Sequence, residues 1–322
     1  MRGVIYIICG KVYQMKYAII SDVHGNLNAL TAVLNDAEYF GVDKYIFVGD
    51  YCSYLPYPNE VVNKIKSLEN NIIVQGNEEG YLTMYSKQDQ STWTDGQFQA
   101  HYWCYRAINS INHEYLAALP KRITFSDSDM NITVTHSSAD IYGDIDHKEF
   151  SSLKVAAKYE MDNSFSREKL LNDIGEYLKK AKFTAVIQSL PDNIYVFGHT
   201  HVQWNARIGN KIFINPGSCG LVLDGLAGAP YTLLDIDNEK IDITERRVQY
   251  DFDKLLHEFQ NSSLFEAAPV WCNIILKEMT ARFGCVLPFL QFVNEYANKI
   301  DDPIRPYSVK TWTEAYNAWQ RV

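Results

Sequence analysis

The sequence predicts an α/β fold, because short apolar strands alternate with amphipathic helices along its first part. Apolar runs at 17–20, 44–48 and 71–74 each end in a polar loop that contains glycine. The segments between them, 27–40 and 59–68, carry apolar residues at helical spacing. This alternation indicates βαβ units, in which the loops after parallel strands gather at one edge of a sheet.

The rest of the chain continues the mixture of helices and strands. We expect a helix over 101–119 that Pro120 stops, a mostly helical stretch over 151–181, and strands at 131–135, 193–197, 211–214 and 231–235. The main domain is therefore predicted to span 15–250. Residues 1–14 form an N-terminal extension, which either reflects the choice of start site or adds an edge strand.

The C-terminal segment 251–322 is predicted to be a helical appendage. It is rich in aromatic residues, and it is too apolar to be a disordered tail. The sequence leaves three roles open: packing on the main domain, covering a cleft, or forming the surface of a homo-oligomer.

Composition and charge exclude several classes of protein. With 322 residues and 47% hydrophobic content, the chain can bury a large core. Its net charge of -9 argues against a protein that binds the backbone of a nucleic acid. The six cysteines form no CxxC pair, and no apolar run is long enough to span a membrane. We therefore expect a cytoplasmic protein with no membrane partner.

Polar residues of the kinds that bind metals follow five of the predicted strands. Most of them stand beside a glycine, which lets the backbone turn sharply and approach an ion. Mn²⁺, Fe²⁺ and Zn²⁺ accept such a mixture of carboxylate, amide oxygen and imidazole. Two ions about 3.5–4 Å apart, bridged by one carboxylate, would hold a hydroxide and polarise a phosphoryl group. The candidate ligands are Asp22, His24, Asp50, Asn77, His136, His199 and His201.

As a set, these motifs resemble those of the calcineurin-like metallophosphoesterase superfamily over about residues 15–250. The matching motifs are DVHGN, Gly49-Asp50, Gly76-Asn77, His136 and GHTH. NPGSCG at 215–220 and the YPNEV stretch resemble the bacterial and archaeal YfcE-type phosphodiesterase branch, which is related to diadenosine tetraphosphatase and to Ser/Thr protein phosphatases. The resemblance implies a four-layer β-sandwich of two mixed sheets flanked by helices.

The resemblance also implies roles for the candidate residues. Asp22, His24, Asp50 and His201 would hold one ion, and Asp50, Asn77, His136 and His199 the other, so that Asp50 bridges. The catalytic set would be Asp50, Asn77, Glu78 and His136. The implied activity is hydrolysis of a small phosphate ester by a metal-bridging hydroxide. Manganese is the leading candidate for both ions, with iron, zinc and nickel as alternatives.

The third motif departs from the family pattern. The family usually has a histidine after the asparagine, followed by an acid, whereas this chain has Glu78 and Glu79. The histidine acts on the phosphoryl oxygen or the leaving group, and losing such an acid costs about 10²- to 10⁴-fold in rate for a poor leaving group. We therefore expect diesters or activated esters to be cleaved better than alkyl monoesters. For Glu78 itself, the alternative interpretation is a solvated loop acid with no role.

Four further histidines lie outside the motifs. His101, His113, His147 and His257 have no ligand neighbours in sequence, so we interpret each as structural or exposed.

Two alternatives to a small-ester phosphoesterase stay open. The first is a non-catalytic scaffold that keeps the fold, and the second is a nuclease of the same superfamily, which the acidic charge disfavours.

Overall fold

The computed structural model describes residues 14–127, 130–142, 166–237 and 240–320. Its strands form two five-stranded sheets, each with parallel and antiparallel pairs. The first sheet has the order β10-β9-β1-β2-β3, with bounds Ile241–Val248, Ala229–Asp237, Gln14–Ile20, Lys44–Phe47 and Asn71–Ile73. The second has the order β4-β5-β6-β8-β7, with bounds Arg122–Asp127, Met130–Thr135, Ile194–Val196, Lys211–Pro216 and Gln203–Ile208.

Helices cover the outer faces of both sheets and one end of the sandwich. Those in the first half are α1 Leu27–Tyr39, α2 Pro58–Lys66, α3 Asn77–Tyr85, α4 Gln99–Ala107, α5 Ser110–Ala117 and α6 Ala139–Tyr142. Those in the second half are α9 Arg167–Leu178, α10 Ala181–Ser189, α11 Phe252–Gln260, α12 Ser263–Ala267, α13 Pro269–Ala281, α14 Val286–Lys299 and α15 Val309–Trp319. None of the described helices is long and apolar enough to cross a membrane.

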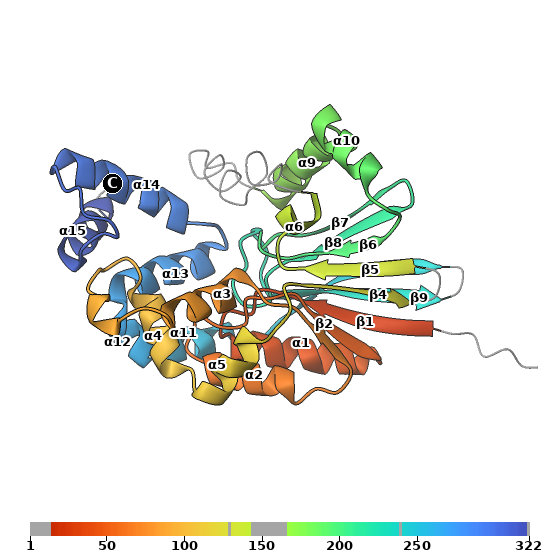
Figure 1. The fold of residues 1–322 in the computed structure, drawn as a ribbon, viewed down its shortest axis with the longest axis horizontal. Helices are drawn as coiled ribbons and strands as arrows, with labels where there is room; N and C mark the ends of the chain where they lie inside the picture. Colours follow the sequence, from red (N-terminus) through yellow and green to blue (C-terminus); the bar gives the residue numbers. More distant parts are fainter. Residues whose placement is uncertain (1–13, 128–129, 143–165, 238–239, 321–322) are drawn as a thin grey trace, which may run out of the picture.

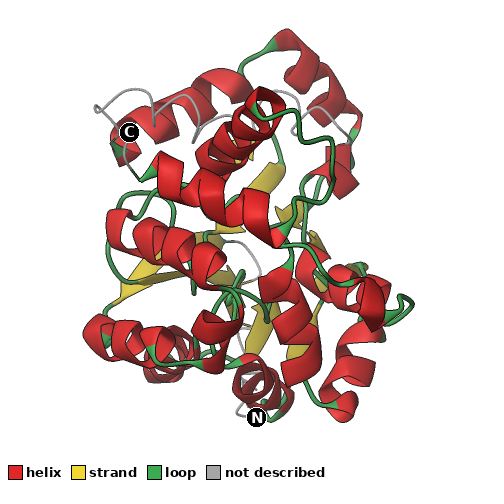
Figure 2. Ribbon diagram, turned by 90° about the vertical axis from the view of Figure 1, so that its left-hand side faces the viewer, coloured by secondary structure: helices red, strands yellow, loops and turns green. Residues whose placement is uncertain are grey.

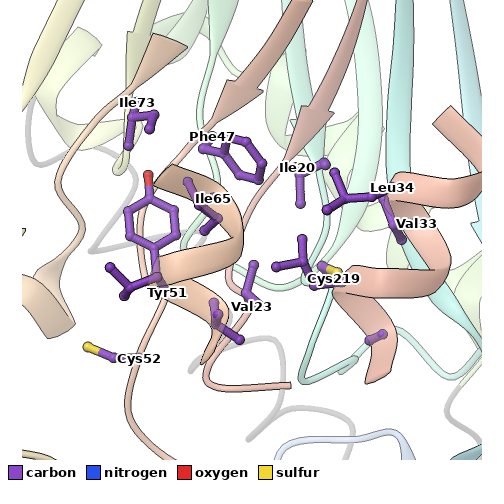
Figure 3. Packing of buried hydrophobic residues seen from close by; sticks show 14 of the residues in the cluster. Ile20, Val23, Val33, Leu34, Phe47, Tyr51, Cys52, Ile65, Ile73 and Cys219 are labelled. Atoms are coloured by element: carbon purple, nitrogen blue, oxygen red, sulfur yellow. The ribbon is translucent and has the colours of Figure 1, made fainter. Parts of the chain in front are cut away.

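Side-chain alternation along the strands explains why the two sheets stack. In β1, Tyr17 and Ile19 face the second sheet, while Ala18 and Ile20 face α1 and α2. Because successive side chains of a strand point to opposite faces, a strand buried on both faces is apolar throughout. Figure 3 shows the helix side of this packing, with Phe47 and other side chains of the first sheet against α1 and α2.

The fold prediction is confirmed as a four-layer sandwich. Helices α1 and α2, the first sheet, the second sheet, and helices α9 and α10 follow one another as layers (Figure 1). All seven predicted strands are present, within a few residues of their predicted ends. The prediction of an extension over 1–14 falls almost entirely outside the described residues, except that Gln14 begins β1.

Three strands and helices α3, α6 and α10 were missed. Strands β4, β7 and β10 each form an edge of a sheet, where one side is less covered and polar residues interrupt the apolar run. Helix α3 begins at Asn77, inside a predicted loop. The single helix predicted over 101–119 is wrong, because Ile108 is extended and Asn109 caps a new helix through its side chain.

The C-terminal helices lie beyond the carboxyl ends of several strands. Figure 1 shows the arrowheads of β1 and β5 pointing toward the side of the molecule where α13 lies. Viewed from that side, helices lie in front of the strands (Figure 2). Helices α11 to α15 form their own core around Phe259, Trp271, Phe289 and Trp312. They are therefore placed to close the end of the sandwich where the polar strand-end residues lie.

Candidate metal centre

The first group of candidate metal ligands consists of Asp22, His24 and His201, and it joins the two sheets. Asp22 and His24 follow β1 of the first sheet, and His201 follows β6 of the second. The Nε2 atoms of His24 and His201 are 3.1 Å apart, and Nε2 of His201 is 3.4 Å from Oδ1 of Asp22. Two ligand atoms that bind one ion at a right angle, each about 2.1 Å from it, are about 3 Å apart. The group therefore has the spacing of ligands to one ion.

The second group consists of Asp50, His136 and His199, and it also draws on both sheets. Asp50 follows β2, while His136 follows β5 and His199 follows β6. Oδ2 of Asp50 lies 3.2 Å from Nε2 of His136 and 4.0 Å from Nε2 of His24 in the first group. One carboxylate oxygen thus faces both groups, as expected from the bridging role that the family resemblance implies for Asp50.

Backbone carbonyls orient two of the imidazoles. Nδ1 of His136 is 2.7 Å from the carbonyl oxygen of Val48, and Nδ1 of His201 is 2.8 Å from that of Leu221. A carbonyl oxygen only accepts hydrogen bonds, so each Nδ1 carries the hydrogen and donates it. The Nε2 atoms, which face the carboxylates, are therefore the atoms available to an ion.

The ligand positions have an uncommon backbone conformation. The φ angles of Asp22, His24, Asp50, His199 and His201 are 52°, 51°, 57°, 68° and 57°. Few residues other than glycine adopt such left-handed angles, and they persist only where the surrounding structure imposes them. Here backbone hydrogen bonds connect the loops after β1 and β2. The amide of Asp22 donates to the carbonyl of Gly49, and the amide of His24 donates to the carbonyl of Asp50.

The donor set fits divalent cations. The side chains of Asp22 and His24 are buried, and Oδ1 of Asp22 and Nδ1 of His24 have no hydrogen-bond partner in the part of the chain that the structure describes. Oδ2 of Asp22 accepts the amide hydrogen of His199, so only Oδ1 of this carboxylate lacks a hydrogen bond among the described residues. A buried carboxylate oxygen of this kind is costly unless a cation compensates it. Carboxylate and imidazole donors together suit manganese, iron or zinc. The two groups therefore match divalent ions in charge and in ligand type.

Asn77 and Glu78 open α3 beside the second group. Oδ1 of Asn77 is 3.0 Å from Nε2 of His136, while its Nδ2 donates to Oε1 of Glu78 at 3.0 Å. Tyr54 also donates its hydroxyl to this Oε1 at 2.9 Å, and Nε2 of His101 lies 3.4 Å from Oε2. Glu78 therefore holds the Asn77 amide with its oxygen toward the second group. It is buried and contacted on three sides, so it is not a solvated loop acid.

His101 was not recognised as a residue of the site. It is buried on α4, next to Glu78 and Tyr54, so the expectation of a structural or exposed side chain missed its place. No sequence signal marks it, because its neighbours in the chain are aromatic residues without ligand character. His147 lies outside the described residues.

Glu79 connects the loops after β2 and β3. Its carboxylate accepts hydrogen bonds from the backbone amides of Asp50, Tyr51 and Gly76 at 2.9–3.0 Å. In the usual motif the second acid orients the preceding histidine. Here the acid instead fixes the backbone on both sides of the bridging carboxylate.

The C-terminal helices form a wall of the pocket that contains both groups. This pocket has a volume of about 190 Å³, and Trp271, Ile275 and Glu278 of α13 line it. Glu278 is buried, its Oε1 accepts hydrogen bonds from the amides of Cys285 and Val286, and burial raises its pKa. Of the roles that the sequence left open for this segment, covering the cleft is therefore observed. Glu278 was not identified from the sequence, although an acid within an apolar helical stripe is a signal that could have found it.

Metal binding is expected to release protons, because neighbouring carboxylates raise the pKa of the ligand His136. Burial acts to lower the pKa of His136, but the carboxylates of Asp50 and Asp22 outweigh it and raise the pKa to about 10. An ion displaces this proton, so the apparent metal affinity should rise about tenfold per pH unit below that value for one proton released. Titration calorimetry with Mn²⁺ near neutral pH, in buffers of different ionisation enthalpy, should show at least one proton released. Identical heats in all buffers would contradict this prediction.

Known proteins resemble this chain in sequence and in fold. A relative from Methanocaldococcus jannaschii, an uncharacterised protein, is 28% identical over 264 residues, which cover 77% of this chain and 93% of the relative. A metallophosphoesterase structure from Sphaerobacter thermophilus has 24% identity and a TM-score of 0.54, covering 80% of this chain and 99% of that one. A hypothetical protein from Pyrococcus horikoshii has 17% identity and a TM-score of 0.59, with 81% and 97% covered. The two structures support the same fold.

The family follows from a match that covers most of the chain. Residues 15–239 match the model of the calcineurin-like phosphoesterase superfamily domain. This range contains both ligand groups and every strand except β10 and the first residue of β1. The resemblance that the motifs indicated is therefore confirmed, and the chain belongs to the calcineurin-like phosphoesterase superfamily.

Proposed function

We propose that this protein is a dinuclear-metal phosphoesterase that hydrolyses a small phosphate diester or an activated ester. The observation that carries the proposal is the placement of Asp50 Oδ2 between two ligand groups, within 3.2 Å of one histidine nitrogen and 4.0 Å of another. Two bound divalent ions, with manganese as the leading candidate, would lower the pKa of a water molecule and polarise the phosphoryl oxygens. The protein residues hold and orient the donors for this chemistry.

Apart from the two proposed ions, the charges that the protein contributes to the pocket disfavour additional negative charge on the substrate. Glu78 and Glu278 line the pocket, and its lining contains neither lysine nor arginine among the described residues. A monoester carries more negative charge than a diester, and an additional unit charge about 8 Å from a carboxylate costs roughly 2 kcal/mol at an effective dielectric constant of 20. Oε1 of Glu78 accepts hydrogen bonds from Tyr54 and Asn77, and Glu78 lacks the imidazole N–H that the usual histidine would direct at the substrate.

We therefore expect a preference for diesters over monoesters. With Mn²⁺ present, kcat/KM for bis(p-nitrophenyl) phosphate should exceed that for p-nitrophenyl phosphate by at least about tenfold, because of the charge penalty. The two substrates release the same phenol, so the comparison reports on the phosphate. Initial rates followed by p-nitrophenolate absorbance measure it, and a preference for the monoester would refute it.

A chelator separates catalysis from the scaffold alternative. Hydrolysis of the diester should stop after treatment with EDTA and return when Mn²⁺ is added, since the proposed chemistry depends on bound ions. A protein that retains about two Mn²⁺ per chain and cleaves neither ester would instead support a binding or scaffolding function.

A further inference from the structure

A second cavity adjoins the metal pocket and has no role in the function proposed so far. We call it the aromatic chamber. Its volume is about 630 Å³, within the range of about 300–1,000 Å³ that is usual for sites that enclose a small ligand. It lies between α3 and α4 on one side and α13 and α14 on the other. The chamber and the metal pocket share a wall of six residues, namely Tyr54, Asn77, Glu78, Trp271, Val286 and Leu287.

The shared wall relates the chamber to the metal centre. Asn77 lines both cavities, and its Oδ1 is 3.0 Å from Nε2 of His136 in the second ligand group. A phosphate held at that group would therefore lie beside the boundary of the chamber. One of its ester substituents would be within reach of the chamber.

Aromatic side chains make up much of the chamber lining. The rings of Trp93 and Tyr102 stack at 4.7 Å with an interplanar angle of 3°, and Tyr85 meets both of them edge-on at 5.6 and 5.3 Å. Tyr81 and Phe98 add two further rings. Rings that pack against each other in this way form a rigid apolar surface, which suits flat apolar groups.

Most carboxylate oxygens of the chamber already accept hydrogen bonds from protein groups. Oδ2 of Asp95 accepts the hydroxyl hydrogen of Tyr102, and Oδ1 accepts the amide hydrogen of Phe98. Glu78 is contacted by Tyr54, Asn77 and His101. No lysine or arginine lines the chamber within the described ranges. An anionic group would find no counter-charge there. A cationic group would meet one carboxylate oxygen without a hydrogen bond, Oε2 of Glu78, and Nε2 of His101 already lies 3.4 Å from it.

We infer that the aromatic chamber binds one ester substituent of the substrate, and that this substituent is an uncharged alcohol that carries a ring. The inference rests on the proposed function, because it places the phosphate at the metal centre. Aryl alcohols and nucleosides both have this chemistry. A second phosphate group in the chamber is excluded by the same argument.

Substrates with a common leaving group test the inference. Each is a p-nitrophenyl phosphodiester, and the second substituent is methyl, phenyl, thymidine or choline. With the Mn²⁺-loaded protein, the phenyl or thymidine ester should exceed the methyl ester in kcat/KM by at least about tenfold, the scale on which an apolar pocket discriminates. If the phenyl ester has the higher kcat/KM, the substituent is an aryl alcohol; if the thymidine ester has the higher value, it is a nucleoside. Equal rates for all four esters, or a preference for choline, would overturn the inference.

A variant that fills the chamber provides the second arm. Met84 lines the chamber and is 43% exposed, so Met84→Trp adds bulk there with little demand on the core. We expect it to reduce the phenyl-to-methyl ratio of kcat/KM by at least about fivefold, since the ring loses its space. Ile111→Trp is the matched control, because Ile111 on α5 is 69% exposed and lies outside the chamber. An unchanged ratio in Met84→Trp would also overturn the inference.

A binding measurement separates this inference from the proposed function. If no ester is cleaved by any protein, the proposed function fails, and saturation-transfer NMR with naphthol still tests the chamber. Transfer to naphthol is expected from the wild type and from Ile111→Trp, and its loss is expected in Met84→Trp. Equal transfer from all three proteins would show that rings do not bind in the chamber.

Discussion

Replacing Asp50 with asparagine is expected to abolish most of the activity and to reduce the metal content from about two ions to about one. The side chain of Asp50 faces both ligand groups through one oxygen, and its other oxygen accepts the amide hydrogen of Glu78. Asparagine keeps the shape but loses the negative charge and offers an amide group to one of these partners. We expect kcat/KM to fall by at least about 10²- to 10³-fold, the effect of removing one preorganised electrostatic group.

Metal analysis and diester hydrolysis on the same preparation measure this result. Asp253→Asn is the matched control, because it makes the same chemical change at an exposed position in the first turn of α11. The control should keep both ions and full activity. An Asp50→Asn protein with two ions and undiminished turnover would show that Asp50 does not bridge.

Substituting Gly76 with alanine is expected to displace the carboxylate of Asp50 through a steric clash. A Cβ atom on Gly76 would lie 2.1 Å from Oδ1 of Asp50 and 2.4 Å from its backbone nitrogen. That nitrogen donates to Glu79, so the loop has little room to move. Overpacking of this kind typically costs 1–3 kcal/mol of stability. We expect Gly76→Ala to bind Mn²⁺ poorly, to lose diester hydrolysis by at least about 10²-fold, and to unfold at a lower temperature.

Gly80→Ala is the control for that substitution on the same helix. A Cβ atom on Gly80 meets nothing within 4 Å, and the residue lies in the interior of α3. Alanine is favoured over glycine there by roughly 0.5–1 kcal/mol, so this variant should be slightly more stable and fully active. Calorimetric unfolding and metal analysis compare the two variants. A Gly76→Ala protein as active as Gly80→Ala would mean that the close approach to Asp50 is not required.

The candidate ligands were accessible to prediction because each follows a strand within a few residues. Apolar strands are local features, and the carboxyl ends of strands gather in space, so Asp22, Asp50 and His136 were grouped from local patterns alone. The strands that precede them are buried on both faces and read as continuous apolar runs. The edge strand β7, with its polar and charged residues, gave no comparable signal. The division into two sheets came from the family resemblance and not from periodicity.

The surroundings of Glu78 were not accessible to prediction, because its contacts come from distant parts of the chain. Tyr54 and His101 lie 24 and 23 positions away, and Trp271 comes from the C-terminal helices. These pairings depend on how α3, α4 and α13 pack together, which local patterns do not encode. For the same reason the sequence left the role of 251–322 open, while the structure shows it lining the pocket.

Each ligand group takes side chains from both sheets, with Asp22 and Asp50 on one side and His136, His199 and His201 on the other. Bound ions would therefore act as non-covalent cross-links at one end of the sandwich. An ion at a free concentration of about 100 times its Kd adds roughly 2.7 kcal/mol to the free energy of unfolding. The melting temperature of a preparation would then depend on its history of exposure to chelators. Two samples of identical sequence would behave as proteins of different stability until their metal contents were matched.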